Sequence, residues 1–585
     1  MADHLATHSL ASCGLPGAWA RHPAWTVLDT DFQDGRRFLS TWLAWRHDPQ
    51  RPRLLHYVGI APAATAAPAD VHPNDEWGTL AHALAAQCTG LGPGFHRIQL
   101  DGGHVSLTLC HGDTQAMLGE QVFQADTVWG GTPQDKWAAQ LLARRCKRGT
   151  RFALHPAAPA APTTAHRAPL AVLLQGAGFQ TDPPSPDADG MVDAFTGTFE
   201  PRWDIPSRRT PRSHAVQPPT RCAVIGAGMA GASVAQALAL RGWQVTVFDQ
   251  DAAPASGASG VPVGLAVPHV SADDNPRSRL SRSGTRLLLQ HAQRLLARGQ
   301  EWDPSGVLER RRNAAPHWHP QAAWIKPATL VQAWLAQPGI TFVGNAKVAG
   351  LHRADDTLWL LQDPQDRELG RFAVVVLANA LGCATLLKNG APADALPGPE
   401  LQDKLAALQA VHGTLSHGTY AEDIPGLPAT PVNGHGCFIP HVPGAGGEQW
   451  VAGSTFETDA LAAADLWAQH AANMARLQHL LPEGGAELAE TLDRGPVAQW
   501  SATRCVTHDR LPLVGPIDTP TGSGLWLCVG MGSRGLSFTA LCAELLAARL
   551  GAEPLPVEHS LSRSLDANRV RRLRPAAAKP APAVD

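Results

Sequence analysis

The sequence lacks several features that would assign it to a particular class of protein. None of its ten cysteines forms a C-x-x-C pair, which argues against a structural zinc site and a thioredoxin-like redox motif. No apolar run approaches the roughly 20 residues of a membrane-spanning helix, and no signal peptide is recognisable. The net charge of −3 indicates no overall preference for nucleic acid or membranes. These absences predict a cytoplasmic protein with reduced thiols, no metal site and no membrane contact.

The chain nevertheless contains enough apolar sequence for more than one domain. It has 585 residues, of which 44% are hydrophobic, and this length exceeds what one core supports. Residues 201–220 hold five prolines and no apolar periodicity, which is typical of an extended linker. We therefore expect a first unit over residues 1–205, a linker over 206–219, a second unit over 220–570 and a disordered tail over 571–585. Nothing in the sequence indicates the oligomeric state.

The second unit opens with a strand, a glycine-rich turn and a helix. Residues 222–225 are a short apolar run suited to a buried parallel strand, and residues 232–241 predict an Ala/Leu-rich helix. Residues 245–248 predict the next strand. This order is the beginning of a doubly wound α/β domain.

The turn carries the G-x-G-x-x-G pattern of dinucleotide-binding proteins. Gly226 permits the tight turn, Gly228 lets the backbone approach a pyrophosphate, and Gly231 lets the helix pack closely on the strand. Asp249 follows the second strand, where a carboxylate can accept hydrogen bonds from ribose hydroxyls. An exposed acid at a strand end would look the same, but the complete strand, turn, helix, strand and acid predict a dinucleotide site.

Three later segments resemble the flavin-contacting segments of the D-amino-acid-oxidase-like superfamily, which includes glycine and sarcosine oxidases. They are SGASG at 256–260, FAVVVLAN at 372–379, and CVGMGSRGL at 528–536 followed by an amphipathic helix. The resemblance implies FAD as the cofactor, in an FAD-binding Rossmann domain interleaved with an α+β substrate domain. The FAD contacts that it implies beyond the turn are Gly257, Ala258, Ser259, Ala378, Asn379, Gly532, Ser533, Gly535 and Leu536.

Two arginines are candidates for the catalytic site. The stretch RCVTHDRLPLVG fits the superfamily pattern R-x-x-T-x-D-x-x-P-x-x-G and begins at Arg504. In glycine-oxidase-like members this arginine holds the substrate carboxylate, as a planar guanidinium can do bidentately. A structural ion pair with Asp509 or another acid is the alternative. Arg534, in the GSRGL turn, is the second candidate, and its alternative role is to tie loops together.

Over nearly all of residues 220–560, the second unit is similar to the MnmC family, the bifunctional tRNA 5-methylaminomethyl-2-thiouridine biosynthesis proteins. The phrases RGWQVT, APASGASG, VVVLAN, RCVTHDRLPLVG and GSRGL carry this resemblance. It implies a methyltransferase-like domain in front of the flavin domain. It also implies that the flavin domain removes the carboxymethyl group from carboxymethylaminomethyl-uridine at the tRNA wobble position, leaving aminomethyl.

The first unit departs from that family's pattern. The stretch DTDFQDGRRFL aligns with the glycine loop E-S-G-F-G-T-G-x-N-F-L, but only Gly35 remains, with Asp31 and Gln33 at the other two glycine positions. Side chains and added carboxylates there would crowd and repel S-adenosylmethionine. Ala61 replaces the ribose-binding acid, and the catalytic loop is reduced to WGGT at 129–132. We expect a degenerate Rossmann-like methyltransferase domain that binds no S-adenosylmethionine and has lost methyl transfer.

Two other functions stay open at the level of sequence. Arg504 and the superfamily signature would equally serve an oxidase of a free small amino acid such as glycine or sarcosine. A scaffold that binds tRNA without catalysis is the non-enzymatic alternative. For contact with tRNA phosphates the best candidate in the first unit is a basic cluster, which could also be a solvated face. Its members are Arg144, Arg145, Lys147, Arg148 and Arg151.

Overall fold

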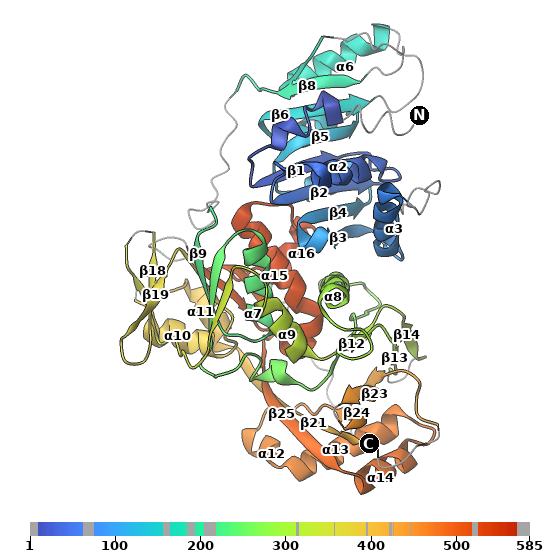
Figure 1. Cartoon of the computed structure of the whole chain (residues 1–585), viewed down its shortest axis with the longest axis vertical. Coiled ribbons are helices and arrows are strands. Elements are labelled where there is room, and N and C mark those ends of the chain that lie inside the picture. Colours follow the sequence, from blue (N-terminus) through green and yellow to red (C-terminus); the bar gives the residue numbers. More distant parts are fainter. Residues whose placement is uncertain are drawn as a thin grey trace, which may run out of the picture.

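The computed structural model of the chain describes residues 10–569 in two units. The description omits residues 63–74, 156–163, 184–193, 204–217, 312–314, 356, 393–395, 421–423, 425, 445 and 518–523. Residues 206–217 of the predicted linker and the predicted tail lie outside the described residues. Figure 1 shows the first unit in blue and teal at one end and the second unit beneath it.

The first unit is built on one eight-stranded sheet in the order β3-β4-β2-β1-β5-β6-β8-β7. Its centre, from β4 to β6, is parallel, and the strands at both edges are antiparallel. The strands are β1 (Ala24–Asp29), β2 (Leu54–Ala61), β3 (Gly94–Leu100), β4 (Val105–His111), β5 (Ala125–Gly131), β6 (Cys146–His155), β7 (Phe179–Thr181) and β8 (Phe195–Phe199).

Helices cover both faces of this sheet, as a parallel sheet requires. On one face α2 and α3 bury Phe38, Trp42 and Leu84 against the strands, and on the other α4, α5 and α6 bury Leu118, Leu142 and Leu174. The helices are α2 (Arg36–His47), α3 (Glu76–Cys88), α4 (Thr114–Gly119), α5 (Lys136–Ala143) and α6 (Thr164–Gly176). The predicted Rossmann-like fold of the first unit is confirmed.

The second unit contains a six-stranded sheet in the order β16-β10-β9-β20-β27-β26, parallel except at β26. Helices α7 and α15 pack against each other beside it, and nearly every residue of both helices is buried. Their Ala/Leu-rich sequences show little polar face because a helix buried on all sides needs none. The strands are β9 (Arg221–Ile225), β10 (Gln244–Phe248), β16 (Ile340–Val343), β20 (Val374–Leu377), β26 (Leu513–Pro516) and β27 (Leu525–Val529), and the two helices are α7 (Met229–Leu240) and α15 (Gly535–Gly551).

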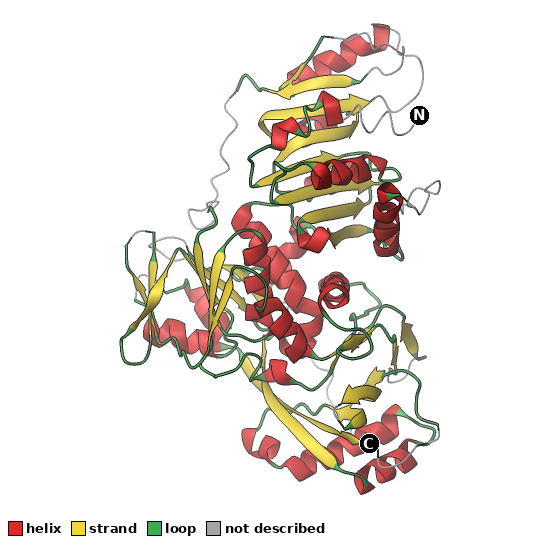
Figure 2. Cartoon of the chain, viewed as in Figure 1, coloured by secondary structure: helices red, strands yellow, loops and turns green. Residues whose placement is uncertain are grey.

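Two small sheets and further helices complete this nucleotide-binding half (Figure 2). The helices are α8 (Pro276–Leu295), α9 (Pro327–Leu335), α10 (Gly382–Gly390), α11 (Pro399–Ala406) and α16 (His559–Ser562). The small sheets are β11 (Gly264–Ala266), β15 (Ala323–Ile325) and β12 (Trp302–Asp303), and β17 (Gly350–Arg353), β18 (Trp359–Gln362) and β19 (Glu368–Phe372).

A seven-stranded sheet, β14-β13-β22-β23-β24-β21-β25, forms the far end of the second unit (Figure 1). Helices α13 and α14 bury Met474, Leu477 and Leu488 against it. Its elements are β13 (Val307–Glu309), β14 (His317–His319), β21 (Gln409–Thr419), β22 (Val432–Gly434), β23 (Gly436–Gly444), β24 (Gly447–Gly453), β25 (Val497–Val506), α12 (Ala460–Ala464), α13 (Leu466–Leu480) and α14 (Gly485–Arg494). This is the predicted α+β subdomain, and its sequence is interleaved with the nucleotide-binding half.

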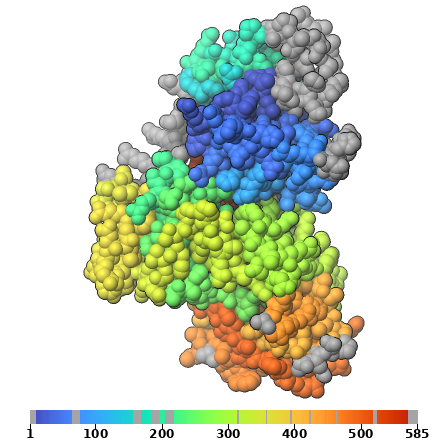
Figure 3. Space-filling view, in the orientation of Figure 1, coloured from blue at the N-terminus to red at the C-terminus, as the bar shows by residue number. Residues whose placement is uncertain are grey.

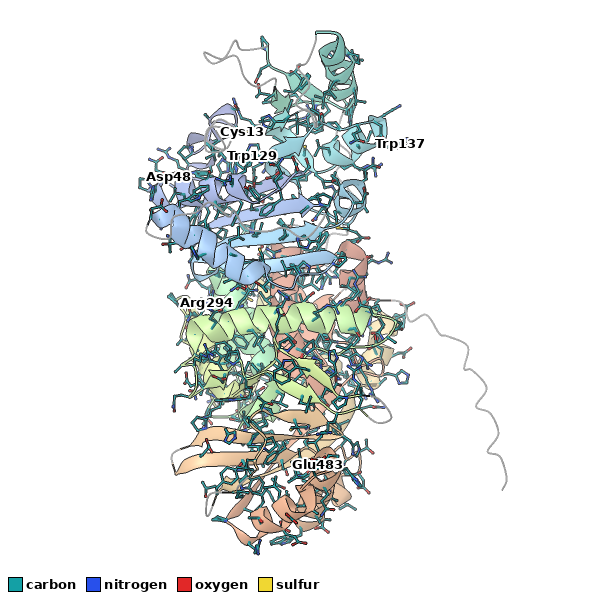
Figure 4. All side chains as sticks on the ribbon, turned by 90° about the vertical axis from the view of Figure 1, so that its right-hand side faces the viewer. Cys13, Asp48, Trp129, Trp137, Arg294 and Glu483 are labelled. Carbon is teal, nitrogen blue, oxygen red and sulfur yellow. The ribbon has the colours of Figure 1, made fainter. Side chains whose placement is uncertain are left out.

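The two units meet along the edge strand β3. Figure 4 shows the long helix α8 lying beneath the first unit's sheet, and Figure 3 shows the two units in contact along this boundary. Gln290 of α8 accepts a hydrogen bond from the backbone of Gln99 at 2.8 Å and donates one to the carbonyl of Arg97 at 3.0 Å. The side chain therefore pairs with the edge strand as a neighbouring strand would. No helix among the described residues is long and apolar enough to cross a membrane.

Candidate functional site

The register of the parallel strands brings three predicted site residues to one sheet edge. Ile225 at the end of β9 lies opposite both Phe248 of β10 and Leu377 of β20. The next residue of each strand, Gly226, Asp249 and Ala378, therefore emerges at the same carboxyl edge. In open α/β sheets this is where ligands bind.

The glycine turn is tightly packed. Gly226 has φ +104°, and a Cβ there would lie 2.8 Å from the carbonyl oxygen of Ala378. A Cβ on Gly231 would overlap the carbonyl oxygen of Gly226. Gly228 is the N-cap of α7. The three glycines therefore let the turn, the neighbouring strand end and the helix approach one another closely.

Two predicted cofactor-binding side chains hold this turn in place. The carboxylate of Asp249 accepts the backbone N–H of Ala227 at 2.6 Å. The hydroxyl of Ser259, in the loop after β10, accepts the N–H of Met229 at 2.9 Å. Asp249 and Ser259 therefore join the second strand and its following loop to the start of α7.

One cavity of about 980 Å³ unites the predicted residues, a size at the upper end of the roughly 300–1,000 Å³ of ligand pockets. Gly231 does not line it and packs beneath the turn. The buried side-chain oxygen of Asn379 has no hydrogen-bond partner among the described residues. The predicted residues that line the cavity are Gly226, Gly228, Asp249, Gly257, Ala258, Ser259, Ala378, Asn379, Arg504, Gly532, Ser533, Arg534, Gly535 and Leu536.

Arg504 on β25 lies in this cavity without a carboxylate partner among the described residues. Its guanidinium donates to Ser454 Oγ at 2.6 Å and to the carbonyl of Thr455 at 3.3 Å, and it lies 4.9 Å from the ring centroid of Phe456. Burial lowers the pKa of Arg504, so the charge is partly desolvated and not neutralised.

The alternative ion pair of Arg504 with Asp509 does not form. Asp509 instead binds Arg569, with Nη2 and Oδ2 2.8 Å apart. Space for the Arg504 guanidinium comes from Gly413 on the neighbouring strand β21, where a Cβ would lie 2.5 Å from the guanidinium nitrogens. Arg504 is therefore available to a ligand.

Arg534 lies at another part of the cavity wall. Its Nη2 is 3.4 Å from His269 Nδ1, and Arg277 Nη2 is 2.8 Å from His269 Nε2. Burial lowers the pKa of Arg534, and the neighbouring charge of Arg277 lowers it further. Among the described residues, the contact with His269 is the observation that favours the alternative role of Arg534, to tie loops together.

Several residues that surround the arginines have no recognisable motif in the sequence. Phe456, whose surface is 56% exposed, lines the cavity together with Ser454 and Trp500. His269 lies beyond β11 in a stretch without a motif. Trp500 lies on the same strand as Arg504, whereas Phe456 and His269 come from segments far from the glycine turn and from the R-x-x-T-x-D pattern.

In the first unit, the crevice at the end of β1 is filled by the protein's own side chains. Phe32 donates its backbone N–H to the carbonyl of Ile60 at 2.9 Å, and its buried ring occupies the space beside Gly59 where a Cβ would project. Gln33 has φ +49° and Gly35 φ +80°. The loop that replaces the glycine loop thus closes onto the end of β2.

Other residues of the two stretches that replace the methyltransferase loops, DTDFQDGRRFL and WGGT, bind neighbouring side chains. The guanidinium of Arg37 binds the buried carboxylate of Asp29 at 2.9 Å, which also accepts from Tyr57 at 2.7 Å. The indole of Trp129 donates to Cys13 Sγ at 3.1 Å (Figure 4). These side chains stabilise the domain interior.

The predicted basic cluster does not form one cationic surface. Arg145 is buried and donates to the carbonyl of Gln121. Lys147 pairs with Asp126, and Arg148 with Glu200. Of the five cations, three are therefore engaged within the first unit.

Residues 221–317 and 289–549 match the FAD dependent oxidoreductase (DAO) family. Curated relatives resemble nearly the whole chain: the "tRNA 5-methylaminomethyl-2-thiouridine biosynthesis bifunctional protein MnmC" of Albidiferax ferrireducens is 46% identical, with 97% of each chain covered. The protein of the same name from Polaromonas naphthalenivorans is 42% identical, with 97% of this chain and 93% of that one covered. Among solved structures, the glycine oxidase of Geobacillus kaustophilus matches 60% of this chain and 99% of its own, at 19% identity and a TM-score of 0.46.

Proposed function

Since the chain belongs to the MnmC family and its second unit to the FAD dependent oxidoreductases, we propose that it is a flavoprotein that oxidises the carboxymethylaminomethyl group of the tRNA wobble uridine to aminomethyl. The homologous proteins are named for tRNA modification. The substrate group is a glycine joined through its nitrogen to the uracil methyl carbon.

The observation that carries this proposal is Arg504. Arg504 lines the cavity, is held by Ser454 and Thr455 and faces no carboxylate among the described residues. Such a partly buried guanidinium favours an anionic ligand. The carboxylate of the glycine group supplies that charge and can bind the guanidinium bidentately. Binding there fixes the adjacent methylene carbon, which is the carbon to be oxidised.

The cavity fits FAD. The glycine positions of the turn, Gly226, Gly228 and Gly231, leave little or no room for a side chain. The start of α7 offers backbone N–H groups to phosphate, and Asn379 has a buried side-chain oxygen without a partner among the described residues. Bound FAD would accept a hydride from the methylene carbon next to the neutral amine. Arg504 and the cavity walls then have the task of presenting that C–H bond and excluding water.

The overall change balances with water as the other reactant. Loss of a hydride and a proton from the N–CH₂ unit gives an imine, and water adds to the imine carbon. The C–N bond then breaks, which leaves the aminomethyl group on the uridine and releases glyoxylate. No side-chain general base is required, because the amine is neutral when the hydride leaves.

The first unit takes no part in methyl transfer in this proposal. Phe32 fills the crevice between the ends of β1 and β2, and Asp31 and Gln33 stand where the family's loop has glycines. A methyl donor would have to displace the buried Phe32 ring, at a cost of about 3 kcal/mol. The unit instead supports the second unit through their shared boundary.

We place the protein in the cytoplasm, where its ten unpaired cysteines are chemically stable.

The test is the nucleoside composition of tRNA from cells with and without the gene. We expect carboxymethylaminomethyl-uridine to accumulate in the deletion strain, to disappear on complementation with the wild-type gene and to persist with the Arg504→Ala variant. Absence of accumulation would contradict the proposal. Release of hydrogen peroxide from glycine or sarcosine by the purified protein, without turnover of tRNA, would assign it to free amino acids instead.

A further inference from the structure

The contacts of His269, which adjoins Arg534 of the cavity wall, leave hydrogen-bond donors without acceptors. One ring nitrogen faces Arg277 at 2.8 Å and the other faces Arg534 at 3.4 Å. A neutral imidazole has one acceptor nitrogen and one N–H. If Nε2 accepts from Arg277, Nδ1 carries the proton. This N–H then points at the guanidinium of Arg534, which is also a donor. An oxygen atom that accepts from both His269 and Arg534 would satisfy this pair.

The positive charge around His269 also exceeds the negative charge. Neither Arg277 nor Arg534 has a carboxylate partner among the described residues, and the buried Nε of Arg277 has no partner there. Glu309 is the acid that acts on both His269 and Arg534. Its carboxylate is already bound by Arg311 at 2.8 Å and by His319 at 2.9 Å.

Burial and this positive charge both act on the imidazole. Desolvation and the charges of Arg534 and Arg277 lower the pKa of His269 to about 4. The ring is therefore neutral at physiological pH and serves as a hydrogen-bond donor.

We propose that His269, Arg277 and Arg534 form a binding site for one RNA phosphate next to the wobble nucleotide. This inference rests on the proposed function, because it assumes an RNA substrate whose modified base enters the cavity. Guanidinium groups are the donors that match phosphate geometry, and phosphate contacts fix the register of a nucleic acid on a protein.

The location suits this role. Arg534 lines the cavity wall, while Arg277 belongs to the first turn of α8, and all three side chains are partly exposed. The N-terminus of a 20-residue helix adds favourable potential for an anion. A nucleotide whose base points into the cavity must leave its phosphate outside it. Arg534 lines the cavity, and His269 and Arg277 adjoin Arg534.

The experiment is a double-mutant cycle between one arginine and one phosphate. The probe is an anticodon stem-loop with the carboxymethylaminomethyl wobble uridine, either unmodified in its backbone or with a neutral methylphosphonate at each flanking phosphate in turn. The protein is the FAD-loaded full chain, as wild type, Arg277→Ala or the control Arg282→Ala. Arg282 lies on the same helix, is exposed and pairs with Asp274 at 3.0 Å.

We expect Arg277→Ala to weaken stem-loop binding about tenfold and to reduce the slope of log Kd against log salt by about 0.7. Arg282→Ala should keep the affinity and turnover of the wild type. One methylphosphonate should weaken binding by the wild type but have little further effect on Arg277→Ala, which identifies the contacted phosphate.

Additive effects of Arg277→Ala and every methylphosphonate would overturn the phosphate site. Loss of FAD absorbance in Arg277→Ala would also overturn it, because the cluster would then bind the cofactor. So would an equal loss of affinity of Arg277→Ala for the modified nucleoside without phosphate, because the cluster would then bind the substrate carboxylate. Failure of the wild type to form aminomethyl-uridine on the stem-loop would instead contradict the proposed function, whatever the cycle shows.

Discussion

The imidazole of His56 in the first unit lies 3.6 Å from the carboxylate of Glu553 in the second unit. Glu553 also binds Arg241 at 2.7 Å, and Arg241 binds Glu544 at 3.0 Å. Arg97 of β3 completes the group, 3.7 Å from Glu544. Two cations, two anions and a neutral histidine are thus enclosed at the boundary between the units. Arg97 comes from the first unit and its partner Glu544 from the second, so the two cations and two anions balance only when both units are present, and the boundary is part of the interior of the protein.

Glu544→Gln should lower the free energy of unfolding by about 3 kcal/mol, because it leaves Arg241 and Arg97 buried with one carboxylate between them. Chemical denaturation measures this change. The control is Glu368→Gln, which removes an exposed ion pair with Arg371 and should change stability by less than about 1 kcal/mol. Equal effects of the two variants would show that the enclosed charges do not stabilise the boundary.

Stability should fall between about pH 6.5 and pH 4 because of His56. Burial lowers its pKa from 6.5 to about 4, so the unfolded chain takes up the proton first as the pH falls. The contribution of His56 to the free energy of unfolding is fully present above pH 6.5. It is lost progressively as the pH falls to about 4, by about 3 kcal/mol in total. The pH dependence of Tm measures it. His56→Gln should flatten this part of the profile, whereas Gln at the exposed His435 should leave the profile as in the wild type.

Gly226→Ala should yield protein without FAD. The added methyl group would lie 2.8 Å from the carbonyl of Ala378 and would strain a residue at φ +104°, so the turn must move. The ratio of flavin to protein absorbance measures the loss. Gly149→Ala is the matched control, because Gly149 also has positive φ, +82°, but open space around it. A yellow Gly226→Ala protein would contradict the assigned role of the turn.

Arg504→Lys should reduce kcat/KM by about 100-fold, since an ammonium cannot bind a carboxylate bidentately, while FAD stays bound. Steady-state kinetics and the flavin spectrum together measure this. Asp509→Asn should affect turnover much less, because Asp509 pairs with Arg569. If Asp509→Asn reproduced the loss, Arg504 would act through that acid and not on the substrate.

Titration calorimetry should detect no binding of S-adenosylmethionine to the full chain. The ring of Phe32 occupies the space beside Gly59, and its loop is bonded to Ile60. Micromolar affinity would show that this loop opens and that the first unit keeps its ligand.

The glycine turn and most of the residues around it could be predicted from the sequence. The strand, helix and acid around Gly226 lie within one short stretch, and the local conformation itself requires glycine there. The basic cluster from Arg144 to Arg151 did not predict a cationic surface, because residues that are neighbours in the chain face different environments. Arg145 is buried, and Arg148 pairs with Glu200.

The sequence alone determined the fold class of both units, the glycine turn and the choice of Arg504 and Arg534, because each depends on residues close together in the chain. The tertiary structure decided what those arginines face. Arg504 lies between Ser454 and Phe456, and Arg534 meets His269 from a loop 265 positions away in the chain. Such contacts depend on how strands and helices pack, which periodicity and motif spacing in one sequence do not specify.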